Sequence, residues 1–222
     1  MTTIRVLLVD DQALLRATFR VLIDSVPDMS VIGEAADGSE AVDRTRAHHP
    51  DVVLMDIRMP GVDGLAATAT ICADPDLADT RVLILTTFEN DEHVAQALRA
   101  GASGFLGKDV TADVLLAGIR TVAAGDSLLS PLATRALITR FLAAPEPENG
   151  LVPSDGLNAL TDREREMMAL AAYGKSNTEI ADELFLSPLT VRSHIQRAMM
   201  KLHARDRAQL VVIAYQSGLV KA

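Results

Sequence analysis

Residues 51–64 read DVVLMDIRMPGVDG, and this stretch decides the fold of the first half of the chain. It opens with a short apolar run, Asp51–Met55, which ends directly at the carboxylate of Asp56. Turn-forming Pro and Gly residues follow. Continuous apolar runs of this length are typical of parallel strands that are buried on both faces. We therefore predict a buried parallel strand with Asp56 at its carboxyl end.

Similar apolar runs recur through residues 1–125, with amphipathic stretches between them. We predict strands at Ile4–Val9, Ser30–Glu34, Asp51–Met55, Arg81–Thr86 and Gly104–Leu106. We predict helices at Ala13–Ile23, Ser39–Ala47, Leu65–Cys72, Glu92–Ala100 and Ala112–Ala124. The alternation of strand and helix indicates an α/β fold, a doubly wound parallel sheet of five strands.

Chemically active residues follow the ends of these strands. Asp10 and Asp11 end the first run, Asp56 ends the third, Thr86 ends the fourth, and Lys108 follows the fifth. Ligands of doubly wound sheets bind at the carboxyl ends of the strands, so we expect these side chains on one rim. Clustered carboxylate oxygens suit Mg²⁺. An aspartate beside Mg²⁺ and a lysine can accept a phosphoryl group, because the positive charges neutralise its oxygens.

A single aspartate after a strand is usually a helix cap or a turn residue. The coincidence of all five side chains at strand ends is what favours a phosphoacceptor site here.

Residues 157–222 predict an all-α domain of four helices with a helix-turn-helix. Each helix has its own start signal: Thr161 with Glu164, Ser176 with Glu179, Ser187 followed by Pro188, and Asp206 with Gln209. The second helix, Asn177–Leu184, is short, and a three-residue turn separates it from the third, Pro188–Leu202. Two helices joined by so short a turn are typical of helix-turn-helix DNA-binding units.

The third of these helices has two faces. Its apolar residues recur at core spacing: Val191, Ile195, Met199 and Leu202. Its polar residues lie largely off that stripe: Arg192, Ser193, Gln196 and Arg197. The N-terminal half of a recognition helix meets base edges in the major groove. Taken alone, the same pattern fits an ordinary solvated basic helix equally well.

The charge of the chain is unevenly distributed. The whole chain of 222 residues has a formal net charge of −9, which at face value argues against binding to a phosphate backbone. Residues 1–125 hold 10 Lys and Arg against 19 Asp and Glu, whereas residues 155–222 hold 9 against 8. The acidity therefore belongs to the first domain, and the second is open to a nucleic-acid partner.

The domain boundaries follow from composition. Residues 144–156 are rich in Pro and Gly and read as a flexible linker. We therefore expect domains at 1–125 and 157–222, joined by a linker region 126–156 that includes a helix at Ser130–Leu142. A single cysteine, Cys72, and the lack of a signal peptide or a long apolar run indicate a cytoplasmic protein.

The first domain resembles the receiver domain of bacterial response regulators. The resemblance rests on VLLVDDQALLR, DVVLMDIRMPGVDG, VLILTTF and ALRAGASGFLGKD, which occur in this order. It implies that Asp56 accepts a phosphoryl group from a histidine kinase or a small phosphodonor. It also implies that Mg²⁺ is bound by Asp11, Asp56 and the backbone carbonyl of Arg58, with Asp10 acting through water.

The same resemblance assigns further roles. Lys108 would pair with the phosphoryl group, and Thr86 would hydrogen-bond to it. Phe105 occupies the aromatic switch position, and its inward swing would fill the space that Thr86 vacates. We also expect the large side chains of Arg58 and Phe88 to shield the acyl phosphate from water.

The second domain resembles the LuxR-type DNA-binding domain over LTDREREMMALAAYGKSNTEIADELFLSPLTVRSHIQRAMMKLHARDRAQLVVIAYQSGLV, residues 160–220. Joined to a receiver, it resembles the NarL/FixJ class. The resemblance implies base contacts from Arg192, Ser193 and Gln196. The residues it places near phosphates are Asn177, Ser187, Thr190 and Arg197. Dimers would form on promoter DNA through the last helix. Val211 and Tyr215 in that helix can face the domain's own core, whereas Ala208 and Val212 could meet across a two-fold axis. Packing within its own domain is an equally good interpretation of Val212.

We therefore expect a transcriptional response regulator, switched by phosphorylation of Asp56, that is not an enzyme beyond supporting its own phosphorylation and dephosphorylation. A Mg²⁺-dependent phosphohydrolase fits less well, because its nucleophile typically lies on the first strand. A ligand-sensing LuxR-type activator would need an apolar pocket in place of the carboxylate rim. The remaining alternative is a DNA-binding regulator whose receiver-like domain works without phosphorylation.

Overall fold

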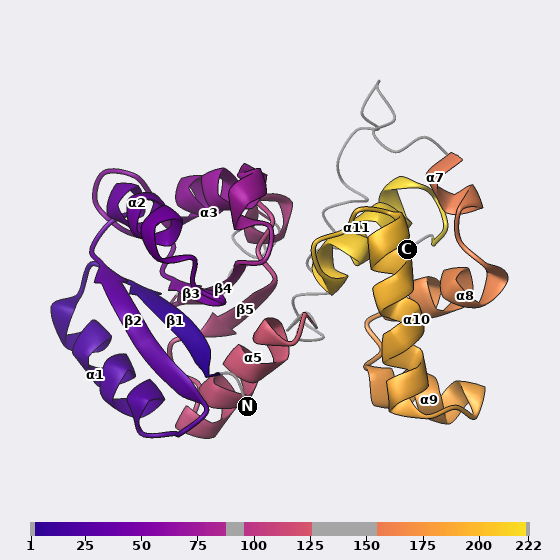
Figure 1. Ribbon diagram of the computed structural model, residues 1–222, viewed down its shortest axis with the longest axis horizontal. Helices are drawn as coiled ribbons and strands as arrows, with labels where there is room; N and C mark the ends of the chain where they lie inside the picture. Colours follow the sequence, from indigo (N-terminus) through magenta and orange to yellow (C-terminus); the bar gives the residue numbers. More distant parts are fainter. Residues whose placement is uncertain (1–2, 88–95, 126–154, 221–222) are drawn as a thin grey trace. The chain divides into compact units, whose positions relative to one another are not determined.

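The computed structural model describes residues 3–87, 96–125 and 155–220 of the chain (Figure 1). It divides into two compact units, Met1–Leu128 and Leu129–Ala222. The first unit is an α/β fold, and the regular elements described in the second, within residues 155–220, are all helices, so the predicted fold classes are confirmed.

A five-stranded parallel sheet forms the centre of the first unit, in the order β2-β1-β3-β4-β5. The strands are β1 (Ile4–Val9), β2 (Met29–Ala35), β3 (Val52–Met55), β4 (Arg81–Thr86) and β5 (Gly104–Gly107). Each lies within one residue of its predicted ends. β1 is next to β3 although β2 lies between them in the chain, so the direction of winding changes there. Doubly wound folds place their ligands at such a point.

Helices cover both faces of this sheet (Figure 1). They are α1 (Ala13–Asp24), α2 (Gly38–His48), α3 (Gly64–Ala73) and α5 (Ala112–Ala123), with a 3₁₀ turn η1 (Pro75–Leu77). α1 and α5 pack on one face through Ile23, Leu115 and Ile119, which join strand residues in one apolar core. α2 and α3 lie on the other face (Figure 1). The predicted helix Glu92–Ala100 lies partly outside the described residues, and residues 96–99 of it are helical.

The second unit contains a short helix, α7 (Asp155–Asn158), before the helices that the sequence predicts. The latter are α8 (Asp162–Ala172), α9 (Asn177–Leu184), α10 (Pro188–Lys201) and α11 (Arg207–Gln216). α7 was not predicted, and its first two residues belong to the stretch that we expected to be linker. The predicted linker helix Ser130–Leu142 lies outside the described residues.

Capping hydrogen bonds determine where these helices begin. Thr161 and Glu164 form a reciprocal capping box on α8, and Ser176 and Glu179 form another on α9. The Ser187 hydroxyl accepts from the Thr190 amide at 3.0 Å, which starts α10. Likewise, the Asp206 carboxylate accepts from the amide of residue 209 at 2.9 Å. All four predicted start signals are confirmed.

The turn between α9 and α10 has a left-handed residue. Phe185 ends α9 with φ 55° and ψ 46°, and only Leu186 and Ser187 separate it from α10. A bulky residue seldom adopts this conformation, so the turn is closely constrained by the helices on either side.

The core of this unit includes buried residues of α10 and α11. They are Val191 and Ile195 on α10, and Leu210 and Val211 on α11. In the described part of the chain, no helix combines the length and the apolar character needed to cross a membrane.

Glu164 ties two helices of the second unit together. Its carboxylate accepts from the Thr161 amide at 2.8 Å and from the Lys201 ammonium at 2.7 Å, so it caps α8 and holds the end of α10. The side chain is only 4% exposed. Burial alone raises the pKa of this carboxyl, but the hydrogen bonds and charge of Lys201 and Thr161 outweigh that effect and lower the pKa below its usual value.

We predict that Glu164→Gln makes the free energy of unfolding of the second unit less sensitive to acidic pH. A carboxyl with a lowered pKa in the folded state stabilises it above the unfolded pKa, and this contribution is lost as the pH falls. The wild type should therefore be more stable than the variant by about 1 kcal/mol at neutral pH. The difference should shrink as the pH falls below 4.5, the usual pKa of a glutamate, and vanish once the pH has passed the lower pKa of the folded state. Urea denaturation of the full chain at a series of pH values measures it.

The matched control is Glu166→Gln on the same helix, where an exposed carboxylate pairs with Arg163 at 2.5 Å. Exposed pairs contribute little to stability, so this variant should follow the wild type at every pH. Identical pH profiles for both variants and the wild type would contradict the role of Glu164.

Candidate functional site

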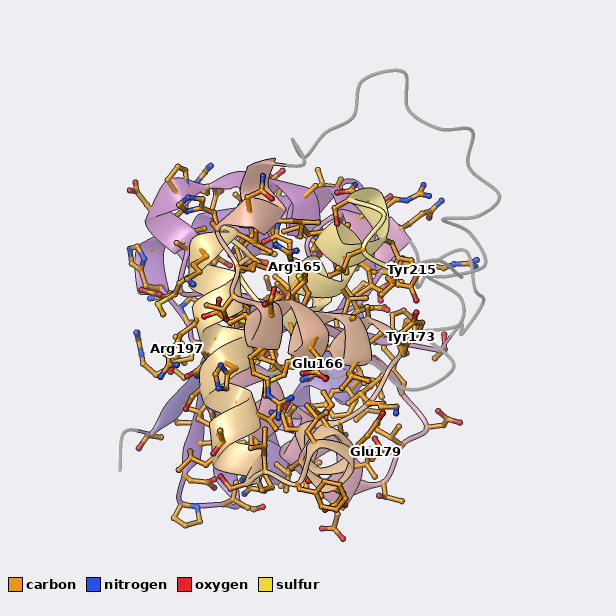
Figure 2. The ribbon with its side chains drawn as sticks, turned by 90° about the vertical axis from the view of Figure 1, so that its right-hand side faces the viewer. Arg165, Glu166, Tyr173, Glu179, Arg197 and Tyr215 are labelled. Carbon is orange, nitrogen blue, oxygen red and sulfur yellow. The ribbon has the colours of Figure 1, made fainter. Side chains whose placement is uncertain are left out.

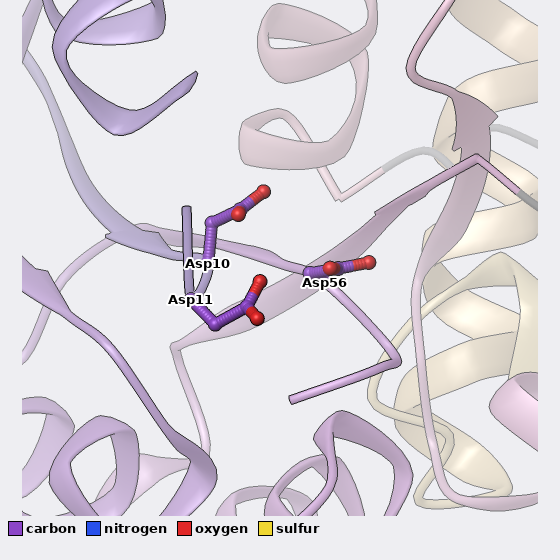
Figure 3. A group of neighbouring side chains, drawn as sticks. All are labelled: Asp10, Asp11 and Asp56. Atoms are coloured by element: carbon purple, nitrogen blue, oxygen red, sulfur yellow. The ribbon is translucent and has the colours of Figure 1, made fainter. Parts of the chain in front are cut away.

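Three carboxylates meet at the carboxyl ends of β1 and β3. Val9 is in register with Met55, so Asp10 and Asp56, which follow them, emerge side by side from neighbouring strands. One carboxylate oxygen each from Asp10, Asp11 and Asp56 lies within 4.8 Å of the others (Figure 3). Asp10 and Asp56 are buried, whereas Asp11 is exposed. The structure thus brings together the cluster expected from the strand ends.

Lys108 lies between the two buried carboxylates. Its ammonium nitrogen is 2.6 Å from Asp10 Oδ2 and 2.9 Å from Asp56 Oδ2, and the side chain is only 6% exposed. Burial and the neighbouring negative charge of Asp10 raise the pKa of Asp56, although Lys108 opposes that shift. Burial alone lowers the pKa of Lys108, but the two carboxylates more than compensate and raise it. The lysine is therefore held as a cation within a cluster of excess negative charge.

Backbone amides hold these carboxylates in position. The Ile57 amide donates to Asp56 Oδ1 and the Gln12 amide donates to Asp10 Oδ1, both at 2.8 Å. At the start of α3, the Gly64 amide donates to the Ile57 carbonyl at 2.9 Å. A side chain at Gly64 would place its Cβ 1.9 Å from the Asp56 carbonyl oxygen. Gly64, the last residue of DVVLMDIRMPGVDG, is therefore needed for the backbone to return close to Asp56.

The donor atoms of this cluster fit Mg²⁺. Carboxylate oxygens alone make up the set, and Mg²⁺ prefers a few such ligands together with water. Exposed Asp11 lines an open hollow of about 510 Å³ together with Arg58, Met59 and Gln96. Of the three carboxylates, Asp11 is the one that lines this hollow.

The expected switch residues lie on the neighbouring strands. Thr86 ends β4 and is 1% exposed, and Phe105 in β5 is 4% exposed. The Thr86 carbonyl accepts from the Lys108 amide at 2.8 Å, so Thr86 and the lysine are linked through the backbone. Arg58 is exposed at the hollow, and Phe88 lies outside the described residues.

Arg16 is a residue of this site that the sequence analysis missed. Its guanidinium donates to the Asp10 carbonyl at 2.6 Å and to Glu34 Oε2 at 3.1 Å, and so ties α1 to the ends of β1 and β2. No local spacing pairs residues 16 and 34, because their contact depends on the β1–β2 pairing. The only signal was that Arg16 belongs to the quoted stretch VLLVDDQALLR.

The second unit presents the expected DNA-facing residues on α9 and α10. Ser187, Gln196 and Arg197 are exposed, and Figure 2 shows Arg197 extending outward from α10. Three further residues of α10 are half-buried: Thr190, Arg192 and Ser193.

Several of these groups have structural partners. The Ser187 hydroxyl caps α10, and the Ser193 hydroxyl donates to the Leu189 carbonyl at 2.9 Å. The side-chain oxygen Oδ1 of Asn177 accepts from the buried guanidinium of Arg207 at 2.6 Å, which joins α9 to α11. The structure therefore gives Asn177 a role in the fold that the sequence did not predict.

The last helix differs from expectation at one position. Val211 is buried, as predicted for a core residue, and Val212 is half-exposed. Ala208, however, is only 2% exposed, so the expectation that it could meet a second copy is wrong. The residue lies one position after buried Arg207, in the first turn of α11, where that guanidinium binds α9.

Two family models match the chain, in the order expected. The response regulator receiver domain matches residues 6–120, and the luxR family of bacterial regulatory proteins matches residues 158–214. Neither model describes a catalytic family.

Relatives match nearly the whole chain. The transcriptional regulatory protein LiaR of Bacillus subtilis is 38% identical over 98% of this chain and 99% of its own. The oxygen regulatory protein NreC of Staphylococcus carnosus is 35% identical over 97% and 99%. Among solved structures, the response regulator ChrA of a heme-sensing two-component system is 33% identical, with a TM-score of 0.52 over 99% of this chain and 100% of ChrA.

The chain belongs to the LuxR-type, or NarL-family, response regulators of two-component systems, with a receiver followed by a DNA-binding domain that regulates transcription. The resemblance on which the sequence analysis relied is thereby confirmed.

We predict that Lys108→Met lowers the free energy of unfolding of the first unit by about 3 kcal/mol, because it leaves two buried carboxylates without their cation. Adding Asp56→Asn to this variant should restore part of the loss, since one uncompensated charge is removed. Urea denaturation of the full chain, with hydrogen exchange of the strand amides, measures both variants. Unchanged stability of Lys108→Met would contradict the ion pairs.

We predict that Gly64→Ala destabilises the first unit by about 3 kcal/mol or more, because the added Cβ overlaps the Asp56 backbone. The control is Gly125→Ala, where φ is +80° but no atom lies within 4 Å of the new Cβ. That variant carries only the cost of the left-handed backbone, about 1 kcal/mol. Equal midpoints of urea denaturation for the two variants would show that the close approach at Gly64 is unimportant.

Proposed function

We propose that this regulator is switched by phosphorylation of Asp56 by a histidine kinase, and that it then binds promoter DNA as a dimer. The observation that carries the proposal is the Lys108 ammonium, which lies within 2.9 Å of Asp56 beside two further carboxylates. The proposal places the protein in the cytoplasm, where its kinase and its promoter DNA are both within reach.

In the proposed reaction, a carboxylate oxygen of Asp56 forms a bond to the phosphorus of the phosphodonor. The bond from phosphorus to the leaving group breaks, the leaving group keeps the electron pair, and Asp56 becomes an acyl phosphate. Asp11, Asp56 and the backbone carbonyl of Arg58 would hold Mg²⁺, with Asp10 acting through water, and the bound ion would supply positive charge that offsets the phosphoryl oxygens. Lys108 supplies a second positive charge and holds the Asp56 carboxylate in place.

Thr86 and Phe105 would transmit the phosphorylation of Asp56 to the rest of the receiver unit. The Thr86 hydroxyl hydrogen-bonds to the new phosphoryl oxygen, and the Phe105 ring occupies the space that Thr86 leaves. Both side chains are buried on adjacent strands, so a movement of one requires a movement of its surroundings. Arg58, exposed at the hollow, shields the acyl phosphate from water in this proposal, as does Phe88.

Base recognition belongs to α10. Arg192, Ser193 and Gln196 face the bases, and Ser187, Thr190 and Arg197 approach the phosphates, as does Asn177. One recognition helix makes few contacts, so two copies that span neighbouring half-sites bind far more tightly. Dimerisation through the last helix, with Val212 at the contact, would make DNA affinity sensitive to phosphorylation.

We predict that acetyl phosphate with Mg²⁺ adds one phosphoryl group to the full chain at Asp56, shifts it from monomer to dimer, and raises its affinity for a specific DNA site. Mass spectrometry locates the group, sedimentation measures the assembly, and fluorescence anisotropy measures the DNA affinity. Omission of Mg²⁺ should prevent all three changes, because the clustered carboxylates then repel the phosphodonor.

Asp56→Asn should abolish the response. The control is Asp63→Asn, which alters a nearby carboxylate that caps α3 and can still accept from the Ala66 amide. If phosphorylated wild-type protein had the same oligomeric state and DNA affinity as the Asp56→Asn variant, phosphorylation would not be the switch. That result would favour a regulator that binds DNA without phosphorylation.

We predict that Arg192→Ala weakens binding to the specific site by about 1–3 kcal/mol and relaxes the base preference at one position. Arg197→Ala should instead weaken binding to all sequences similarly, because a phosphate contact carries no base information. Selection of bound sequences from random DNA by each variant distinguishes the two. An unaltered base preference for Arg192→Ala would exclude it from base recognition.

A further inference from the structure

Leu189 is an apolar side chain left exposed at the start of α10. It follows Pro188 in the first turn and is 72% exposed. Single exposed leucines are common on protein surfaces, so exposure alone assigns it no role. Its position relative to the polar face of the same helix is informative.

Residues three, four and seven positions apart lie on one face of a helix. Leu189 is related in this way to Arg192, Ser193 and Gln196. The Ser193 hydroxyl donates to the Leu189 carbonyl at 2.9 Å, which confirms that the two residues are neighbours on the helix surface. The side chain of Leu189 therefore forms the leading, N-terminal end of the surface that faces the bases in the proposed function.

We propose that Leu189 packs against the C5-methyl group of a thymine in the major groove, and so selects thymine at one position of each half-site. This inference rests on the proposed DNA-binding function of α10. Among the base edges in the major groove, the thymine methyl is the apolar group, and the other positions present donors and acceptors. A leucine pressed against those polar edges would remove them from water without offering a hydrogen bond.

The surroundings of Leu189 suit such a contact. The Ser187 cap and Pro188 hold the first turn of α10 in its helical conformation before any DNA is bound. Arg197 on the same helix supplies positive charge that attracts the phosphates in the proposed function. The leucine is thus placed in advance, and little conformational freedom is lost when it contacts a base.

The test uses the full chain treated with acetyl phosphate and Mg²⁺. Specific sites are first selected from random double-stranded DNA, and each thymine is then replaced singly by deoxyuridine, which lacks only the C5-methyl group. We expect one thymine in each half-site whose replacement weakens binding of the wild type about fourfold, the effect of one buried methyl group. Leu189→Ala should bind the thymine and deoxyuridine duplexes equally well.

Met200→Ala is the matched control. Met200 is also an exposed apolar residue of α10, 68% exposed, but it lies at the opposite end of the helix. This variant should keep the full thymine preference of the wild type. Leu189→Gln provides a second variant, which should lose the preference while circular dichroism shows an intact fold.

A thymine whose methyl group matters equally to the wild type and to Leu189→Ala would overturn the inference, as would a site with no methyl-sensitive thymine. These outcomes leave the proposed function standing, because specific sites have been selected. Failure to select any specific sequence would instead overturn the proposed DNA-binding function and the inference with it.

Discussion

The ammonium group of Lys108 between two buried carboxylates is the interaction on which the receiver unit depends. Asp10 and Asp56 come from neighbouring strands, and Lys108 follows the strand at the far edge. Without a cation, the two carboxylates would repel each other in a poorly solvated place. Three carboxylates share this one ammonium group, so the cluster keeps an excess of negative charge. In the proposed function, Mg²⁺ would offset that excess and so allow a phosphoryl group to approach Asp56.

The electrostatics of the chain show why charge must be considered domain by domain. A total of −9 argues against DNA, yet the second unit is almost neutral and its α10 has several basic residues. A nearly neutral domain gains little non-specific affinity from phosphates. In the proposed function, specific base contacts and the pairing of two copies provide most of the binding, and assembly becomes the point of control.

Much of the fold was predictable because its signals are local. The strands ending at Asp10, Asp56 and Thr86 were located within one residue, and all four helix caps of the second unit appeared as expected. Local signals did not show α7, whose residues have the Pro- and Gly-rich surroundings of a linker. Nor did they show that Ala208 is buried, because burial depends on what packs against a helix and not on its own spacing.

The sequence by itself determined the elements, their order, the two domains and the residue types at the strand ends. Periodicity, caps and turns encode these features over a few residues. Only the tertiary structure decided that Lys108 contacts both Asp10 and Asp56, that Arg16 braces the Asp10 backbone, and that Arg207 engages Asn177. These contacts join residues far apart in the chain. They exist because strand register and helix packing bring them together, and no local pattern specifies either.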